Sequence, residues 1–168
     1  MICPHCGYDN IQGADECARC MQDLTYLDEP TADSFVEQLI MEDPVRVLKP
    51  AVPVCVSPDT PLGDVIRTMS EKRIGCLLVT DGPELVGILT ERDLLMNLAG
   101  REAELANDPV REWMTPNPET VAEDDAIAYA IHKMDVGGYR HLPVMDGTRP
   151  KGVISVRDLV GFLAAYLA

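Results

Sequence analysis

Residues 87–93 of this chain read GILTERD, and residues 152–158, 65 positions later, read GVISVRD. The same register holds around these two heptapeptides without a gap, since DPV at 43–45 matches DPV at 108–110. A repeat of this length indicates one structural unit that occurs twice and packs against its copy. A binding site in one copy should therefore have a counterpart in the other.

Each copy carries the same order of apolar patterns. Two apolar runs joined at an Asp-Gly pair, 76–80 with 85–89 and 142–145 with 152–154, predict a hairpin in each copy. Short extended segments at 52–56 and 119–121 come first, and a last helix is expected to start at Glu91 or Val156. Apolar residues at i, i+3, i+4 and i+7 predict a helix with one buried face after each extended segment. These residues are Leu62, Val65, Ile66 and Met69 in the first copy and Ile127, Ala130, Ile131 and Met134 in the second.

Each copy is therefore predicted to run strand, helix, strand, strand, helix, which is an α/β or α+β fold with small sheets. The predicted boundaries give a cysteine-rich unit at 1–26, a linker and helix at 27–42, a first repeat at 43–105 and a second at 106–168. Asp28-Glu29-Pro30 is interpreted as the linker. Helical spacing over 31–41, with Thr31 or Asp33 as the N-cap, predicts a helix whose counterpart by register lies near 96–106.

Composition and charge exclude several classes of protein. Apolar residues make up 46% of the chain, which suffices for a packed core and is too many for a disordered chain. The sequence has neither an apolar run of about 20 residues nor a signal-peptide pattern at its start, so a cytoplasmic location without membrane association is expected. The formal net charge of −14 disfavours nucleic acid and anionic membrane surfaces as partners.

Four of the six cysteines form two Cys-x-x-Cys pairs, Cys3/Cys6 and Cys17/Cys20. Each pair places two thiolates on one side of a tight turn, and two pairs complete a tetrahedral shell around zinc. The segment resembles a short zinc ribbon, and it is expected to be a structural staple for a segment too small to fold alone. Iron in a rubredoxin-like site is the alternative, because four thiolates suit either ion.

Three motifs make the repeated region similar to a pair of CBS domains. They are the Gly-x-x-Thr/Ser-x-x-Asp boxes at 87–93 and 152–158, the LPV at 142–144 and the WMTP at 113–116. The resemblance covers residues 43–168 and implies two β-α-β-β-α repeats packed as a pseudo-twofold pair. It also implies a regulatory module that binds adenine nucleotide (AMP, ADP or ATP), or alternatively S-adenosylmethionine or a dinucleotide, in clefts between the repeats. A homodimer is expected on the same ground.

The resemblance further implies which residues hold the ligand. The aspartate of each box holds the ribose, and the Thr or Ser assists. The arginine beside each aspartate is, by its position alone, within reach of a phosphate. The strand before each box supplies the base pocket, and only the second copy carries a proline and basic residues there, so the two sites should be unequal and the second stronger for phosphate. The implied contacts are Ile74, Gly75, Cys76, Thr90, Arg92 and Asp93 in the first copy and Thr120, Tyr139, Arg140, His141, Leu142, Pro143, Ser155, Arg157 and Asp158 in the second.

The boxes also have a purely structural interpretation. Thr90 with Asp93, and Ser155 with Asp158, have the form of a helix capping box, in which hydroxyl and carboxylate satisfy unpaired backbone N–H groups. Such a cap accounts for the motif without any ligand. It does not exclude binding, because a helix N-terminus also suits a phosphate.

Three functions of different classes follow from these features. A regulatory module that transmits nucleotide binding to a protein partner or dimer mate is favoured. An interaction scaffold with empty clefts, whose zinc ribbon is the working surface, is the first alternative, and an iron-binding redox protein is the second. No enzyme activity is expected, because the sequence has no Ser/His/Asp set, no phosphate-cradling Gly-rich loop and no open metal position.

Overall fold

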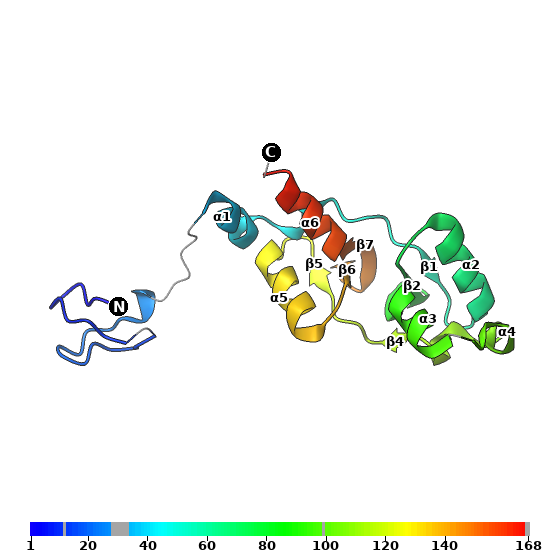
Figure 1. Ribbon diagram of the computed structural model, residues 1–168, viewed down its shortest axis with the longest axis horizontal. Coiled ribbons are helices and arrows are strands. Elements are labelled where there is room, and N and C mark those ends of the chain that lie inside the picture. Colours follow the sequence, from blue (N-terminus) through cyan, green and yellow to red (C-terminus); the bar gives the residue numbers. More distant parts are fainter. Residues whose placement is uncertain (12, 28–33, 99, 167–168) are drawn as a thin grey trace. The chain divides into compact units, whose positions relative to one another are not determined.

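The computed structural model describes residues 1–11, 13–27, 34–98 and 100–166, and the chain separates into two compact units (Figure 1). Unit 1 is Met1–Gln38 and unit 2 is Leu39–Ala168. The linker expected at Asp28-Glu29-Pro30 and the caps expected at Thr31 or Asp33 lie outside the described residues.

Unit 1 is built from two turns, each closed by a short antiparallel bridge. The bridges pair Ile2 with Asp9 and Glu16 with Asp23, and a 3-10 turn, η1, follows at Thr25–Leu27. Leu24 is buried beside Cys3 and Cys17, so the core of this unit consists mainly of thiol groups. A core this small is stable only with an additional cross-link such as a metal ion.

The predicted order of elements is found in unit 2. In the first half β1 (Cys55–Val56) is parallel to β2, β2 (Cys76–Asp81) is antiparallel to β3 (Glu84–Thr90), and the helices are α2 (Leu62–Lys72) and α3 (Glu91–Leu98). In the second half β5 (Val121–Ala122) is parallel to β6, β6 (His141–Asp146) is antiparallel to β7 (Arg149–Ser155), and the helices are α5 (Ile127–Gly137) and α6 (Val156–Ala164). The prediction of a mixed α/β fold built from two such repeats is confirmed.

The matching helices α2 and α5 bury the faces that their spacing predicts. The fully or nearly buried residues are Leu62, Val65 and Met69 in α2 and Ile127, Ala130 and Met134 in α5. Both helices end on a residue in the left-handed conformation, Arg73 at φ 53° and Gly138 at φ 63°. The hairpins turn at Gly82 and Gly147, with φ of 58° and 60°, which the missing β-carbon permits.

The segment that leads into each repeat crosses to the other half. Strand β4 (Thr115–Pro116), at the start of the second repeat, pairs with β3 of the first, and Ala51 forms the matching bridge to Val153 of the second. Residues of the leading segments also pack into the core of the other half. Val45 and Leu48, in the 3-10 turn η2 (Val45–Leu48), belong to the core of the second half, whereas Val110, in η3 (Val110–Glu112), belongs to the core of the first.

One predicted helix is found, and its counterpart is found only in part. Helix α1 spans Phe35–Glu42, and the Ser34 hydroxyl accepts a hydrogen bond from the Glu37 amide at 3.2 Å. The counterpart expected near 96–106 is the short helix α4 (Glu102–Leu105), which ends before Asp108-Pro109. It does not include the start of this range, because α3 extends to Leu98 and Gly100 takes a φ of 88°. Glycine in the left-handed region ends a helix.

Within the described ranges, no helix combines the length and the apolar character that crossing a bilayer requires.

Candidate functional site

The two boxes adopt the same geometry at the start of α3 and of α6. The Asp93 carboxylate oxygen Oδ2 accepts hydrogen bonds from the Thr90 amide at 2.9 Å and from the Thr90 hydroxyl at 2.6 Å. In the second box Asp158 Oδ2 accepts from the Ser155 amide and hydroxyl, both at 2.7 Å. Both boxes are therefore helix caps, as the structural interpretation predicts.

The caps leave acceptor capacity on both aspartates. Among the described residues, each recorded side-chain hydrogen bond to Asp93 or Asp158 ends on Oδ2, so Oδ1 faces no protein donor. Both aspartates are half-buried and line a cleft. The cap thus holds a carboxylate in a fixed orientation with one oxygen available to a ligand, and capping and binding are compatible.

The first box opens into a cleft of about 480 Å³, which we term the narrow cleft. Its walls come from β3 and α3 of the first half, from 115–119 at the start of the second repeat, and from 137–141 between α5 and β6. Thr90, Arg92 and Asp93 therefore face the segment that contains Tyr139, Arg140 and His141.

The second box opens into a cleft of about 880 Å³, which we term the wide cleft. Ser155, Arg157 and Asp158 line it together with the approach segment 51–54 and the last turn of α2. Ile74, Gly75 and Cys76 of the first half also line this cleft, and its apolar wall is Val52, Val54, Ile66, Met69, Leu94 and Val153.

The structure thus pairs boxes and base-pocket strands across the two repeats, whereas the sequence analysis paired them within each repeat. The within-repeat pairing holds only in part. Gly75 lines the cleft of the first box, and Arg140 and His141 line the cleft of the second, whereas Ile74 and Cys76 line only the wide cleft and Tyr139 only the narrow one. Three of the implied contacts line neither cleft. Leu142 and Pro143 are buried in β6, and the Thr120 carbonyl instead accepts a hydrogen bond from the Lys133 ammonium at 2.9 Å.

Four residues line both clefts: Gly75, Glu91, Arg140 and His141. The His141 imidazole is half-buried, and this burial lowers its pKa below the usual value, against the opposite influence of the Glu91 and Asp158 carboxylates. Arg140 and Arg157 act in the same direction as the burial. The neutral imidazole is therefore favoured where the clefts adjoin.

Sequence reasoning missed Glu91 as a site residue. The sequence did contain a sign of it, because Glu91 of the first box corresponds to the uncharged Val156 of the second, so the two boxes differ in charge at this position. Burial, assisted by the Glu91 carboxylate, raises the pKa of the Cys76 thiol to about 12. Cys76 is therefore a protonated, buried thiol on the wall of the wide cleft, as expected for a core cysteine.

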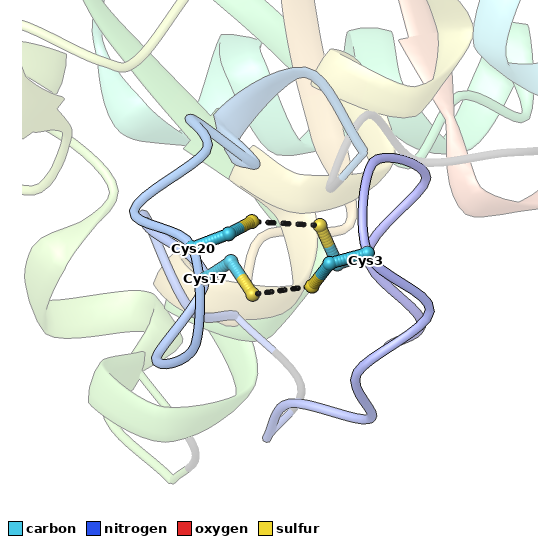
Figure 2. Close-up of side chains that lie close together, drawn as sticks. Cys3, Cys17 and Cys20 are labelled. Carbon is cyan, nitrogen blue, oxygen red and sulfur yellow. Dashed lines mark hydrogen bonds between the residues drawn. The ribbon is translucent and has the colours of Figure 1, made fainter.

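Unit 1 brings its four cysteines into one cluster. Cys3, Cys6, Cys17 and Cys20 offer sulfur atoms that all lie within 4.8 Å of one another. The Cys3 and Cys20 sulfurs are 3.7 Å apart, and the Cys6 and Cys17 sulfurs are 3.6 Å apart. Figure 2 shows Cys3 on one turn facing Cys20 on the other. Disulfide sulfurs are about 2.0 Å apart, whereas a tetrahedron with zinc–sulfur bonds of about 2.3 Å has edges of about 3.8 Å. The thiol groups fit a tetrahedral metal ion.

Hydrogen bonds from backbone amides and from Asn10 favour the thiolate form of Cys17. Burial opposes ionisation of Cys17, but the amides of Arg19 and Cys20 and the side chain of Asn10 lower the pKa of this thiol to about 6. The Asn10 amide nitrogen lies 3.6 Å from the Cys17 sulfur. Since a metal binds the thiolate, these hydrogen bonds favour the form of Cys17 that coordinates a metal ion.

Comparisons with known proteins agree with this geometry. The model of the CBS domain family matches residues 36–100 and again residues 110–165. The CBS domain-containing protein CBSCBSPB5 of Arabidopsis thaliana is 36% identical over 128 residues, which are 76% of this chain and 23% of that protein. The chain thus spans about a quarter of the length of this relative.

Two solved structures share the architecture of the pair. The CBS-domain protein ATU1752 from Agrobacterium tumefaciens is 32% identical with a TM-score of 0.63, over 70% of this chain and 94% of that one. PAE2072 from Pyrobaculum aerophilum, a CBS domain protein complexed with AMP, is 25% identical with a TM-score of 0.63, over 74% of this chain and 99% of that one. Family match, sequence identity and fold agree: this chain belongs to the CBS domain family and carries two CBS domains in tandem.

Proposed function

We propose that unit 2 is a regulatory module that binds adenosyl ligands in its two clefts. The observation that carries this proposal is the capped aspartate in each cleft, with Oδ2 fixed by the helix cap and Oδ1 available. An oriented carboxylate at a cleft wall suits the two neighbouring hydroxyls of a ribose. The AMP in the PAE2072 structure, at 25% identity, supports an adenosine ligand.

The other cleft residues fit the remaining parts of such a ligand. Apolar side chains at one wall of the wide cleft offer a surface for an adenine ring, and Arg157 lies in the same cleft beside Asp158. In the narrow cleft, Tyr139 offers an aromatic surface and Arg92 a cation beside Asp93. Adenine nucleotide or another adenosyl compound is therefore the proposed ligand class for both clefts.

Binding is proposed to stiffen the junction of the two repeats. Each cleft has walls from both halves, so a bound ligand contacts both and stabilises their packing. A change in this junction can pass to a dimer mate or regulated protein when one of two states binds the ligand more tightly. Unit 1 is proposed to hold zinc as a structural centre, since its four sulfurs form a shell without an open position.

Titration calorimetry with AMP, ATP and S-adenosylmethionine tests the proposal on the zinc-loaded chain. Wild type should bind at least one of them, and Asp93→Asn with Asp158→Asn should weaken binding roughly tenfold or more by removing both charged acceptors. Asparagine keeps an oxygen for the cap, so the variants should remain folded. The matched control is Asp146→Asn, an exposed aspartate at the end of β6 that lines neither cleft.

A failure of all three ligands to bind would favour the scaffold function instead. One observation speaks for that alternative, because unit 1 exposes 82% of Ile11, 69% of Ile2 and 68% of Met21. Apolar groups at such exposure suit a protein partner. Variants Ile11→Ser and Met21→Ser should then reduce the association of the chain with its partner while leaving the clefts unaffected.

A further inference from the structure

The two clefts differ in charge. Three arginines, Arg73, Arg140 and Arg157, line the wide cleft with two carboxylates, Glu91 and Asp158. The narrow cleft reverses this balance, with Arg92 and Arg140 against Glu91, Asp93 and Glu119. Even when the Lys133 ammonium, 2.7 Å from Glu119, is counted with the narrow cleft, its positive charges do not exceed its negative ones.

The three arginines of the wide cleft are without acidic partners in the described part of the chain. Arg73, Arg140 and Arg157 form no ion pair with a described carboxylate, and neither does Arg92 of the narrow cleft, whereas Arg46, Arg67, Arg101 and Arg111 are paired. The chain as a whole has a net charge of −14, so carboxylates are abundant. Three guanidinium groups left unpaired around one cavity thus form a local site of positive charge that suits an anion.

Two residues create the difference in charge: Arg73 is the third cation of the wide cleft, and Glu119 is the third carboxylate of the narrow one. Arg73 ends α2 in the left-handed conformation, with φ 53°, where a side chain is sterically disfavoured. The same position at the end of α5 is Gly138, with φ 63°, and this glycine lines the narrow cleft. A strained residue other than glycine at the wall of a cleft indicates a role in that cleft, because a glycine would adopt this turn without strain.

We infer that the wide cleft takes an adenosine ligand with two or more phosphates and that Arg73 selects for phosphate number. The narrow cleft takes an adenosyl ligand with one phosphate or none. This inference rests on the proposed function of the clefts. An adenosine di- or triphosphate carries several negative charges, and guanidinium groups bind phosphate oxygens in pairs of hydrogen bonds. The volumes agree, since the wide cleft has about 880 Å³ and the narrow cleft about 480 Å³.

The test measures binding to the wide cleft alone, in a chain that carries Asp93→Asn to weaken the narrow cleft. Calorimetry with adenosine, AMP, ADP and ATP should give affinities that increase with phosphate number. Adding Arg73→Gly should weaken ADP and ATP about tenfold or more and change adenosine less than twofold. Arg73→Lys, which keeps the charge, should retain most of the preference for ATP.

Arg73→Gly also distinguishes a loss of binding from a loss of folding. Because Gly138 occupies the matching turn, Arg73→Gly should unfold at the same temperature as its parent or higher. The reciprocal change, Gly138→Arg in a chain carrying Asp158→Asn, should strengthen ADP binding to the narrow cleft, since a β-carbon there meets no atom within 4 Å.

The outcomes separate the two proposals. Equal affinities for adenosine and ATP, or an ATP affinity unchanged by Arg73→Gly, would overturn the selection by phosphate number and leave adenosyl binding intact. Absence of binding by all four ligands to the wide cleft would overturn both proposals there.

Discussion

The His141 imidazole of the second repeat lies against the backbone of Gly75 in the first. A β-carbon placed on Gly75 would come within 2.9 Å of His141 Nε2 and 3.5 Å of Glu91 Oε2. The absence of a side chain at Gly75 therefore lets the imidazole occupy the boundary that the two clefts share. His141 cannot move without changing both clefts.

We expect Gly75→Ala to affect both clefts at once. The new methyl group displaces the end of a side chain rather than backbone, so the free energy of unfolding should change by less than about 1 kcal/mol. The displaced imidazole should weaken ligands of both clefts severalfold, measured in chains that carry Asp93→Asn or Asp158→Asn. An effect on one cleft only would show that the imidazole does not serve both. Gly161→Ala is the control for the general cost of replacing a glycine, because Gly161 is exposed in α6, lines neither cleft and has no atom within 4 Å of an added β-carbon.

Acidification should destabilise unit 2 through His141. Burial depresses the pKa of this imidazole from its usual 6.5, so the folded state binds fewer protons than the unfolded state below that pH. Its favourable contribution is therefore complete above about pH 6.5 and is lost as the pH falls through the depressed value. Unfolding of wild type and His141→Gln between pH 7.5 and 5 should show the steeper loss in wild type, while the exposed His132→Gln should behave as wild type.

A bound phosphate should raise the depressed pKa of His141. The negative charge of the bound phosphates acts in the same direction as the Glu91 and Asp158 carboxylates, which favour the protonated imidazole. Arg140 and Arg157 act in the opposite direction. The pKa of His141 should therefore rise when ADP or ATP binds, which an NMR titration of the imidazole proton can measure. A fall of this pKa on binding would place the phosphates away from His141.

Removal of metal should unfold unit 1 and leave unit 2 intact. The described core of unit 1 has Leu24 and buried thiols, so its folding depends on the ion. Chelation or Cys17→Ser should abolish the dispersed NMR signals of 1–27, while the unfolding temperature of unit 2 and its nucleotide binding remain unchanged. Metal analysis should give one zinc per chain, and coloured protein containing iron would instead support the redox alternative.

Truncation of Val45 should loosen the second half although Val45 precedes the first repeat's helices in sequence. Val45 is fully buried in the core of the second half, so Val45→Ala should cost about 2 kcal/mol. Hydrogen exchange should accelerate first in β6 and β7. Val47, 41% exposed in the same turn, is the matched control, and Val47→Ala should change the stability by less than about 0.5 kcal/mol. Faster exchange confined to β2 and β3 would contradict the exchanged packing.

The local structure could be predicted from sequence because short-range patterns determine it. Spacing of Leu62, Val65 and Met69 fixes the buried face of α2, and the turn glycines Gly82 and Gly147 fix the hairpins. The cysteine spacing likewise predicts a cluster that the folded chain forms. The helix expected near 96–106 is present only as α4 (Glu102–Leu105), because Gly100 adopts a left-handed conformation that apolar periodicity does not detect.

The composition of the clefts could not be predicted in the same way. Which strand faces which box depends on packing between the halves, and the 65-residue register is equally compatible with pairing inside a repeat or across repeats. Arg73 was missed for a related reason. It lies outside the boxes, and only the left-handed turn at the end of α2 and the lining of the wide cleft single it out.

The crossing of Val45 and Val110 into opposite cores bears on how such a chain could have arisen. In a single copy the leading valine would have no partner core to pack into. The core of that copy would also lack the valine that the other copy supplies. Two identical copies could satisfy each other by reciprocal exchange, as in a domain-swapped dimer. Gene duplication would then have joined an obligate pair into one polypeptide, after which Arg73 and Gly138 were free to diverge while the valines were not.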